Sequence, residues 1–134
     1  MGLLRWNTTA LTVAGQLSMT NATPSYLNNP LGIFIDTFDT LYVADSSNNR
    51  VQQFLFGSTI GTTSAGQANG VSGSISARLN LPSDVAVDLN GNVYVVEVNN
   101  HRVQLWHVNA TFGITVAGNG KILSENHTFI LIIY

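Results

Sequence analysis

The chain has 134 residues, of which 45% are hydrophobic and 9% are charged, and its net charge is −2. Soluble proteins average about 25% charged residues. The five Lys and Arg residues are dispersed, so the sequence offers no basic patch for phosphates and we expect no binding to nucleic acid. Cysteine is absent, which excludes disulfides and thiolate metal sites. No apolar run is long enough to span a bilayer, so we expect no membrane anchor.

The predicted elements are short β-strands separated by polar turns, because apolar runs rich in Val, Ile and Tyr alternate with Gly, Asn, Ser and Asp. Two of the runs are apolar almost throughout, which predicts strands covered on both faces. An Asn-Gly pair at Asn90-Gly91 predicts a type I′ hairpin turn. In chain order the predicted strands are Gly32–Asp36, Leu41–Ala44, Arg50–Phe54, a weaker one near Thr62–Ala65, then Asp84–Asp88, Val93–Val96, Arg102–Trp106 and Ile114–Ala117.

The second group of strands repeats the first. When Leu27–Pro30 is aligned with Leu79–Pro82, a spacing of 52 residues, the register holds without a gap. A shorter copy precedes both, since Val13–Gln16 is similar to Ser64–Gln67. A fixed period of this size indicates stacked supersecondary units. Four antiparallel strands in each unit predict the blade of a β-propeller.

The motif P-x-G-I-x-x-D followed by L-Y-V-A-D-S-x-N-N-R-V-Q resembles the NHL repeat. The resemblance implies an all-β fold, a partial β-propeller of four-stranded antiparallel blades whose ring is incomplete, in a family in which six blades are common. It divides the chain into a partial blade with an inter-blade loop (1–26), two repeat blades (27–78 and 79–119) and an atypical apolar tail (120–134). Long polar loops at 16–26 and 67–78 are expected between blades.

The charged and tyrosine residues of the repeat are interpreted as structural rather than catalytic. A carboxylate and an arginine flank the same turn in both units, which favours an ion pair that joins adjacent strands over a ligand site. A carboxylate that ends the first strand of each unit is expected to bond the backbone of the next turn, with a cation site at the channel mouth as the alternative. These repeat-motif residues are Asp36, Tyr42, Asp45, Arg50, Asp88, Tyr94, Glu97 and Arg102.

No catalytic, cofactor-binding or metal-binding residue is predicted. His101, His107 and His127 lack a zinc spacing, and no segment carries a nucleophile elbow or a phosphate-binding loop. His101 stands where the repeat itself accepts Asn or His. We expect four aromatic residues to pack between blades: Phe54, Phe56, Tyr94 and Trp106.

The sequence therefore favours a non-enzymatic binding or scaffold module that recognises an unidentified protein. Two alternatives stay open: part of a propeller enzyme, lyase- or lactonase-like, whose site lies in other blades, and, less favoured, an RNA-binding propeller. Propellers need four to eight blades, whereas two are visible here. We expect the sequence to be a fragment of a longer propeller or to have an incorrectly defined gene end, with self-assembly of copies into a ring as the alternative.

Overall fold

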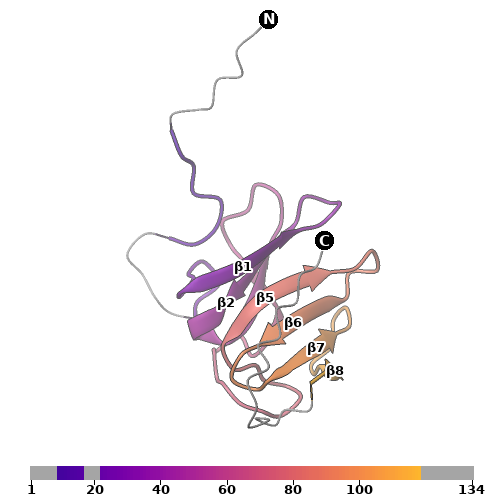
Figure 1. The fold of residues 1–134 in the computed structure, drawn as a ribbon. Helices are drawn as coiled ribbons and strands as arrows, with labels where there is room; N and C mark the ends of the chain where they lie inside the picture. Colours follow the sequence, from indigo (N-terminus) through magenta and orange to yellow (C-terminus); the bar gives the residue numbers. More distant parts are fainter. Residues whose placement is uncertain (1–8, 17–21, 119–134) are drawn as a thin grey trace, which may run out of the picture.

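The computed structural model describes residues 9–16 and 22–118, and this part of the chain folds into two four-stranded sheets. Figure 1 shows their arrangement. The predicted tail at 120–134 lies outside the described residues. No helix within the described ranges is long and apolar enough to cross a membrane. The strands are β1 (Pro30–Ile35), β2 (Leu41–Asp45), β3 (Arg50–Phe54), β4 (Thr62–Gly66), β5 (Pro82–Val87), β6 (Val93–Glu97), β7 (Arg102–Trp106) and β8 (Ile114–Ala117).

Each sheet is an antiparallel meander in which consecutive strands pair, in the order β1-β2-β3-β4 and β5-β6-β7-β8. The registers of the two sheets correspond, since Asp45 pairs with Arg50 and Glu97 with Arg102. β1 and β5 both start at a proline, a position where a strand tolerates the missing N–H. The prediction of an all-β, partial propeller with four-stranded blades is confirmed.

The β5–β6 turn differs from the predicted type I′ hairpin. Gly91 has a positive φ of 80°, but Asn90 does not. The Asp88 carboxylate accepts the backbone N–H groups of Asn90 and Asn92, both at 2.9 Å, which holds a longer turn. A type I′ hairpin needs positive φ at both central residues. The side-chain acceptor at Asp88 therefore selects a different turn from the one that the Asn-Gly pair alone predicts.

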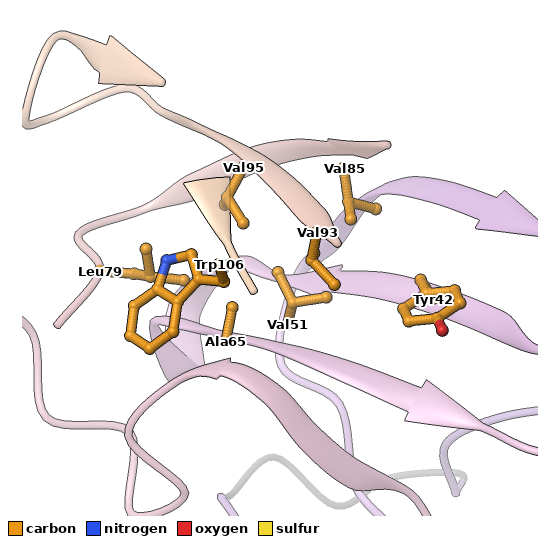
Figure 2. Close-up of a cluster of buried hydrophobic side chains, with 8 residues drawn as sticks. All are labelled: Tyr42, Val51, Ala65, Leu79, Val85, Val93, Val95 and Trp106. Carbon is orange, nitrogen blue, oxygen red and sulfur yellow. The ribbon is translucent and has the colours of Figure 1, made fainter. Parts of the chain in front are cut away.

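The hydrophobic core lies between the two sheets (Figure 2). β1, β2 and β3 of the first blade contact β5, and β4 contacts β6. Residues from both sheets meet there: Tyr42, Val51 and Ala65 from the first, with Val85, Val93, Val95, Trp106 and the loop residue Leu79 from the second. Burial of these side chains joins the blades, at about 25 cal/mol per Å² of apolar surface.

The described residues cover the two outward faces of this pair of blades only in part: Val43, Gln52 and Phe54 on the outward face of the first sheet are buried, whereas its first strand is exposed. On β1, Ile33 is 63% exposed and Ile35 is 60% exposed. The prediction that this strand is covered on both faces is wrong, because a second blade packs on one face only. Phe56, expected between blades, is 84% exposed, since it follows β3 in a turn, whereas Phe54 and Trp106 are buried.

Candidate functional site

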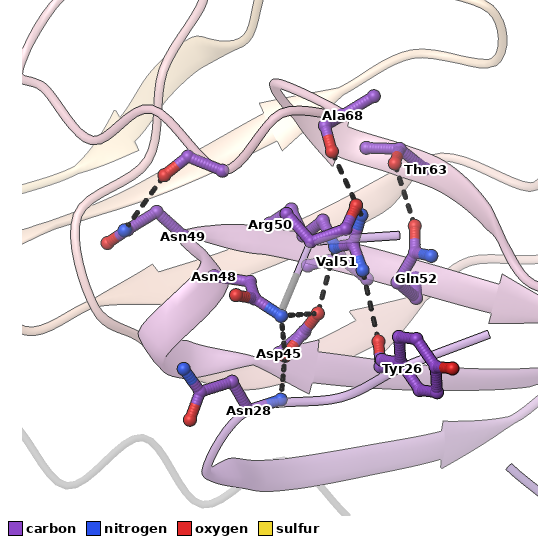
Figure 3. Close-up of polar contacts among 12 residues, drawn as sticks. Tyr26, Asn28, Asp45, Asn48, Asn49, Arg50, Val51, Gln52, Thr63 and Ala68 are labelled. Carbon is purple, nitrogen blue, oxygen red and sulfur yellow. Dashed lines mark hydrogen bonds and ion pairs between the residues drawn. The ribbon is translucent and has the colours of Figure 1, made fainter. Parts of the chain in front are cut away.

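The ends of the blades differ in chemistry, and one end is dominated by a buried ion pair in each blade. In the first blade Asp45 ends β2 and Arg50 begins β3, and a short 3₁₀ helix (Ser46–Asn48) connects them. The Arg50 Nε donates to Asp45 Oδ2 at 2.8 Å, and both side chains are at most 1% exposed. Asp45 also accepts the backbone N–H of Asn28 at 2.7 Å and the side-chain amide of Asn48 (Figure 3).

Arg50 uses every N–H of its guanidinium group. Apart from Asp45, its acceptors are backbone carbonyl oxygens of the two loops that flank the blade. Nη1 donates to Ala22 and Ala68 at 2.5 and 2.9 Å. Nη2 donates to Thr23 and Tyr26 at 2.9 and 3.1 Å. A guanidinium has five N–H donors, so none of them is left for a ligand.

The second blade repeats this network one repeat period later. Arg102 Nε donates to Glu97 at 2.6 Å. Glu97 accepts the backbone N–H of Asn80 and the amide of Asn100, as Asp45 does from Asn28 and Asn48. Arg102 also donates to the carbonyl groups of Ser74, Ile75 and Arg78, which are the repeat equivalents of Ala22, Thr23 and Tyr26. The longer Glu97 thus holds the same partners as Asp45.

These ion pairs connect each blade to the loop that precedes it. A buried charge is tolerated only when it is paired and its other donors are satisfied. Both conditions hold at Asp45 and Arg50, where the carboxylate and the guanidinium bond only to groups of the chain itself. The arrangement has the properties of a structural fastener, and we use that name for the Asp45–Arg50 and Glu97–Arg102 pairs.

The opposite end carries a groove between the two blades, with a volume of about 590 Å³. The β1–β2 turn, the β5–β6 turn and the β7–β8 turn form its rim. Asp36 and Asp88 line it, with apolar side chains of Phe38, Leu89 and Val108 beside them. We call this feature the inter-blade groove. Its described lining includes no lysine or arginine.

Asp36 fixes the first of these turns and contacts a tyrosine. Its Oδ1 accepts the backbone N–H groups of Phe38 and Thr40 at 2.8 and 2.9 Å. The hydroxyl of Tyr42 donates to Asp36 Oδ2 at 3.4 Å. Burial of the Tyr42 ring, followed by the nearby Asp36 charge and this hydrogen bond, raises the pKa of the hydroxyl above 10.0. The Tyr42 hydroxyl is therefore protonated at neutral pH and acts as a hydrogen-bond donor to Asp36.

Asp88 occupies the equivalent position and forms a longer polar chain. Its Oδ2 accepts the side-chain amide of Asn92 at 2.8 Å, and Asn92 Oδ1 lies 3.0 Å from Nδ1 of His107. The hydrogen bonds from Asn92 and, to a lesser extent, Asn90 and the neighbouring His107 lower the pKa of the Asp88 carboxyl below 3.8. Tyr94, the counterpart of Tyr42, is half-buried on the outward face of the second blade.

The geometry does not assemble a metal centre from the described residues, where no group of three or more His, Asp or Glu side chains is placed to hold an ion. Asp36 and Asp88, the alternative cation ligands, each spend one oxygen on turn N–H groups. Within the same ranges the Nε2 of the buried Gln104 lacks a hydrogen-bond partner. Gln104 lies at the core of the second blade, away from the groove.

Several residues of these sites were not among the predicted ones. Asn92 and His107 line the far side of the turn that Asp88 organises, and they occur only in the second blade. Asn28 and Asn80 act through backbone N–H groups, which no residue type reveals. The repeat register was the available signal, because the backbone partners Asn28, Ala22, Thr23 and Tyr26 of the first blade recur at the equivalent positions of the second.

Comparison with known protein families identifies the repeat in the sequence of both blades. The model of the NHL repeat matches residues 27–54 and 79–105, which include the first three strands of each sheet except Trp106, the last residue of β7. The matched segments contain both fasteners and both turn aspartates. No curated protein matches the chain.

Proposed function

The chain contains two NHL repeats, at residues 27–54 and 79–105, and on this premise we propose that it is a non-enzymatic binding module that holds a segment of another protein in its inter-blade groove. The observation that carries the proposal is the contrast between its two ends. At the fastener end Arg50 and Asp45 are buried and satisfied by the chain itself. At the groove end, exposed apolar side chains stand beside aspartates whose second carboxylate oxygen accepts fewer hydrogen bonds from the chain than the first.

The chemistry of the groove favours an extended peptide with one basic and one apolar side chain. Phe38 is 81% exposed and Leu89 is 89% exposed, and they stand on turns from adjacent blades. Exposed apolar residues on loops held by a rigid scaffold are typical of recognition surfaces. Asp36 and Asp88 add negative charge in a lining without lysine or arginine, which favours a lysine or arginine of the partner.

The same features make a nucleic-acid partner unfavourable. Phosphate groups are bound by Lys and Arg side chains that are free to reach them. Arg50 donates all its N–H groups to the chain, and Arg102 donates to Glu97 and three carbonyl groups. The aspartates of the groove would repel a phosphate backbone.

Selection of random peptides displayed on phage against the immobilised full chain tests the proposal. We expect enriched peptides to carry a Lys or Arg close to a bulky apolar residue. Binding should weaken roughly 10-fold when Phe38 or Leu89 is changed to Ser, since one apolar contact contributes about 1.5 kcal/mol. Phe56→Ser is the matched control, because Phe56 is equally exposed but outside the groove. Equal loss with Phe56→Ser, or no enrichment, would refute the proposal.

A further inference from the structure

The two outward faces of the blade pair are the counterparts of the two faces that already pack together inside the chain. Within the chain, the face of the first sheet with Tyr42, Ala44 and Val51 contacts the face of the second sheet with Val85 and Val93. The repeat register assigns each of these a counterpart on an outward face. We call the outward face of the first sheet the leading face (Ile33, Ile35, Leu41, Val43) and that of the second the trailing face (Ala86, Tyr94, Val96, Val103).

Burial shows that part of each outward face lacks the cover that its counterpart has, although Val43 and Phe54 on the leading face are 2% exposed. On the leading face Ile33 is 63% exposed, whereas its counterpart Val85, inside the chain, is 5% exposed. On the trailing face Val96 is half-buried, whereas its counterpart Ala44 is completely buried. Tyr94 and Val103 are likewise half-buried where Tyr42 and Val51 are buried. Contiguous apolar patches of this kind mark interaction surfaces.

We propose that the two outward faces bind each other between copies of this chain, with the leading face of one copy packed on the trailing face of the next. The contact would repeat the interface inside the chain, because both faces belong to the same repeat and most of their side chains are apolar in the same register, such as Ile33 with Val85 and Tyr94 with Tyr42. A second copy therefore presents a surface that is complementary to each outward face and can cover it.

The loops do not obstruct this contact. In the first blade the loop before β1 lies over Gln52, whose amide donates to the Pro24 carbonyl, and Gly61 donates to the same oxygen. In the second blade Gly113 donates in the same way to the carbonyl of Ser76. That blade packs against its neighbour with its loop in place, so the first blade can do the same with a neighbouring copy.

A leading-to-trailing contact is heterologous, so each copy has one free face of each kind until the ring closes. Closed propellers have four to eight blades, and therefore two to four copies are needed. The expected particle has a mass of two to four times the 14.4 kDa of one chain. Its blades then cover every face that is exposed in the single copy.

Light scattering after gel filtration of the full chain, at high micromolar concentration, tests the assembly. We expect the wild type to form the closed particle. Ile33→Lys blocks the leading face and Val96→Lys the trailing face, and each variant alone should be monomeric with an unchanged far-ultraviolet circular dichroism spectrum. Tyr94→Lys replaces Val96→Lys if the latter does not fold. Phe56→Lys, outside both faces, should assemble like the wild type.

Mixing the two blocked variants distinguishes a head-to-tail contact from a symmetric one. Each retains the face that the other lacks, so the mixture should form a one-to-one heterodimer that grows no further. A monomeric wild type overturns the proposal. So does assembly of either blocked variant by itself, because a face would then bind its own kind, and so does a mixture that stays monomeric.

Discussion

Replacement of Arg50 by alanine tests whether the fasteners hold the blades together. The side chain is 1% exposed, and its removal leaves the fully buried Asp45 carboxylate with only the Asn28 and Asn48 donors. It also removes the donors to four backbone carbonyl groups in the flanking loops. The perturbation therefore affects a charge and two loops at once.

The magnitude follows from the loss of one partner of a buried pair, which costs about 3–5 kcal/mol. We expect Arg50→Ala to fall in this range. Arg50→Lys should lose roughly 1–3 kcal/mol, because an ammonium group keeps the charge but cannot reach acceptors in both loops. Arg102→Ala should cost less than Arg50→Ala, because Arg102 is 9% exposed and fewer of its donors are bound by described residues.

Urea denaturation followed by circular dichroism measures these differences, at one fixed protein concentration because the proposed assembly would couple stability to concentration. A double-mutant cycle of Arg50→Ala with Asp45→Ala isolates the pairwise contribution, which we expect to be favourable by about 1–3 kcal/mol. The reasoning is refuted if Arg50→Ala destabilises by less than about 1 kcal/mol, the level of an exposed ion pair.

Three further predictions concern the core, the inner strands and the groove. Trp106→Ala should cost about 3–5 kcal/mol, whereas Phe56→Ala should change stability by less than about 0.5 kcal/mol, and similar losses in urea denaturation would contradict the buried and exposed positions of the two rings. Gly32→Ala should cost about 1–3 kcal/mol, because the added Cβ would lie 2.7 Å from a Cα atom of β5; an unchanged melting temperature would be inconsistent with that approach. The lowered pKa of Asp88 means that its contribution to stability is complete above 3.8 and is lost as pH falls through the lowered value. Carboxyl carbon NMR should give a midpoint below 3.8 that moves towards 3.8 in Asn92→Ala, and an unmoved midpoint would assign the shift to another cause.

The strands could be predicted from sequence because each carries an apolar run bounded by turn residues. Arg50–Phe54, Arg102–Trp106 and Ile114–Ala117 were predicted with the bounds that the structure gives. The repeat then fixed how the strands pair, since two copies in one register imply two equivalent sheets. The coverage of β1 was predicted wrongly, because an apolar strand looks the same whether its neighbouring blade lies in the described chain or not.

The fasteners were visible as pairs of charges around a turn, but their partners were not. Four acceptors of Arg50 are backbone carbonyl groups, which every residue possesses. The groove was also invisible, because it is formed by turns far apart in the sequence. Asn90-Gly91 misled the turn prediction for a related reason: the decisive group is the Asp88 carboxylate, whose hydrogen bonds extend the turn.

The acceptors of Arg50 extend from Ala22, ahead of the first strand, to Ala68, after the fourth. The segment that supplies all hydrogen-bond partners of this arginine therefore extends beyond both ends of the four-stranded sheet. Gene duplication in steps of one whole repeat, in any phase, recreates the loop before each new blade together with its acceptors. Such an array can gain or lose blades in evolution without requiring a new contact. The inserted or deleted segment must have the length of a whole repeat, but it need not begin or end at the edge of a sheet.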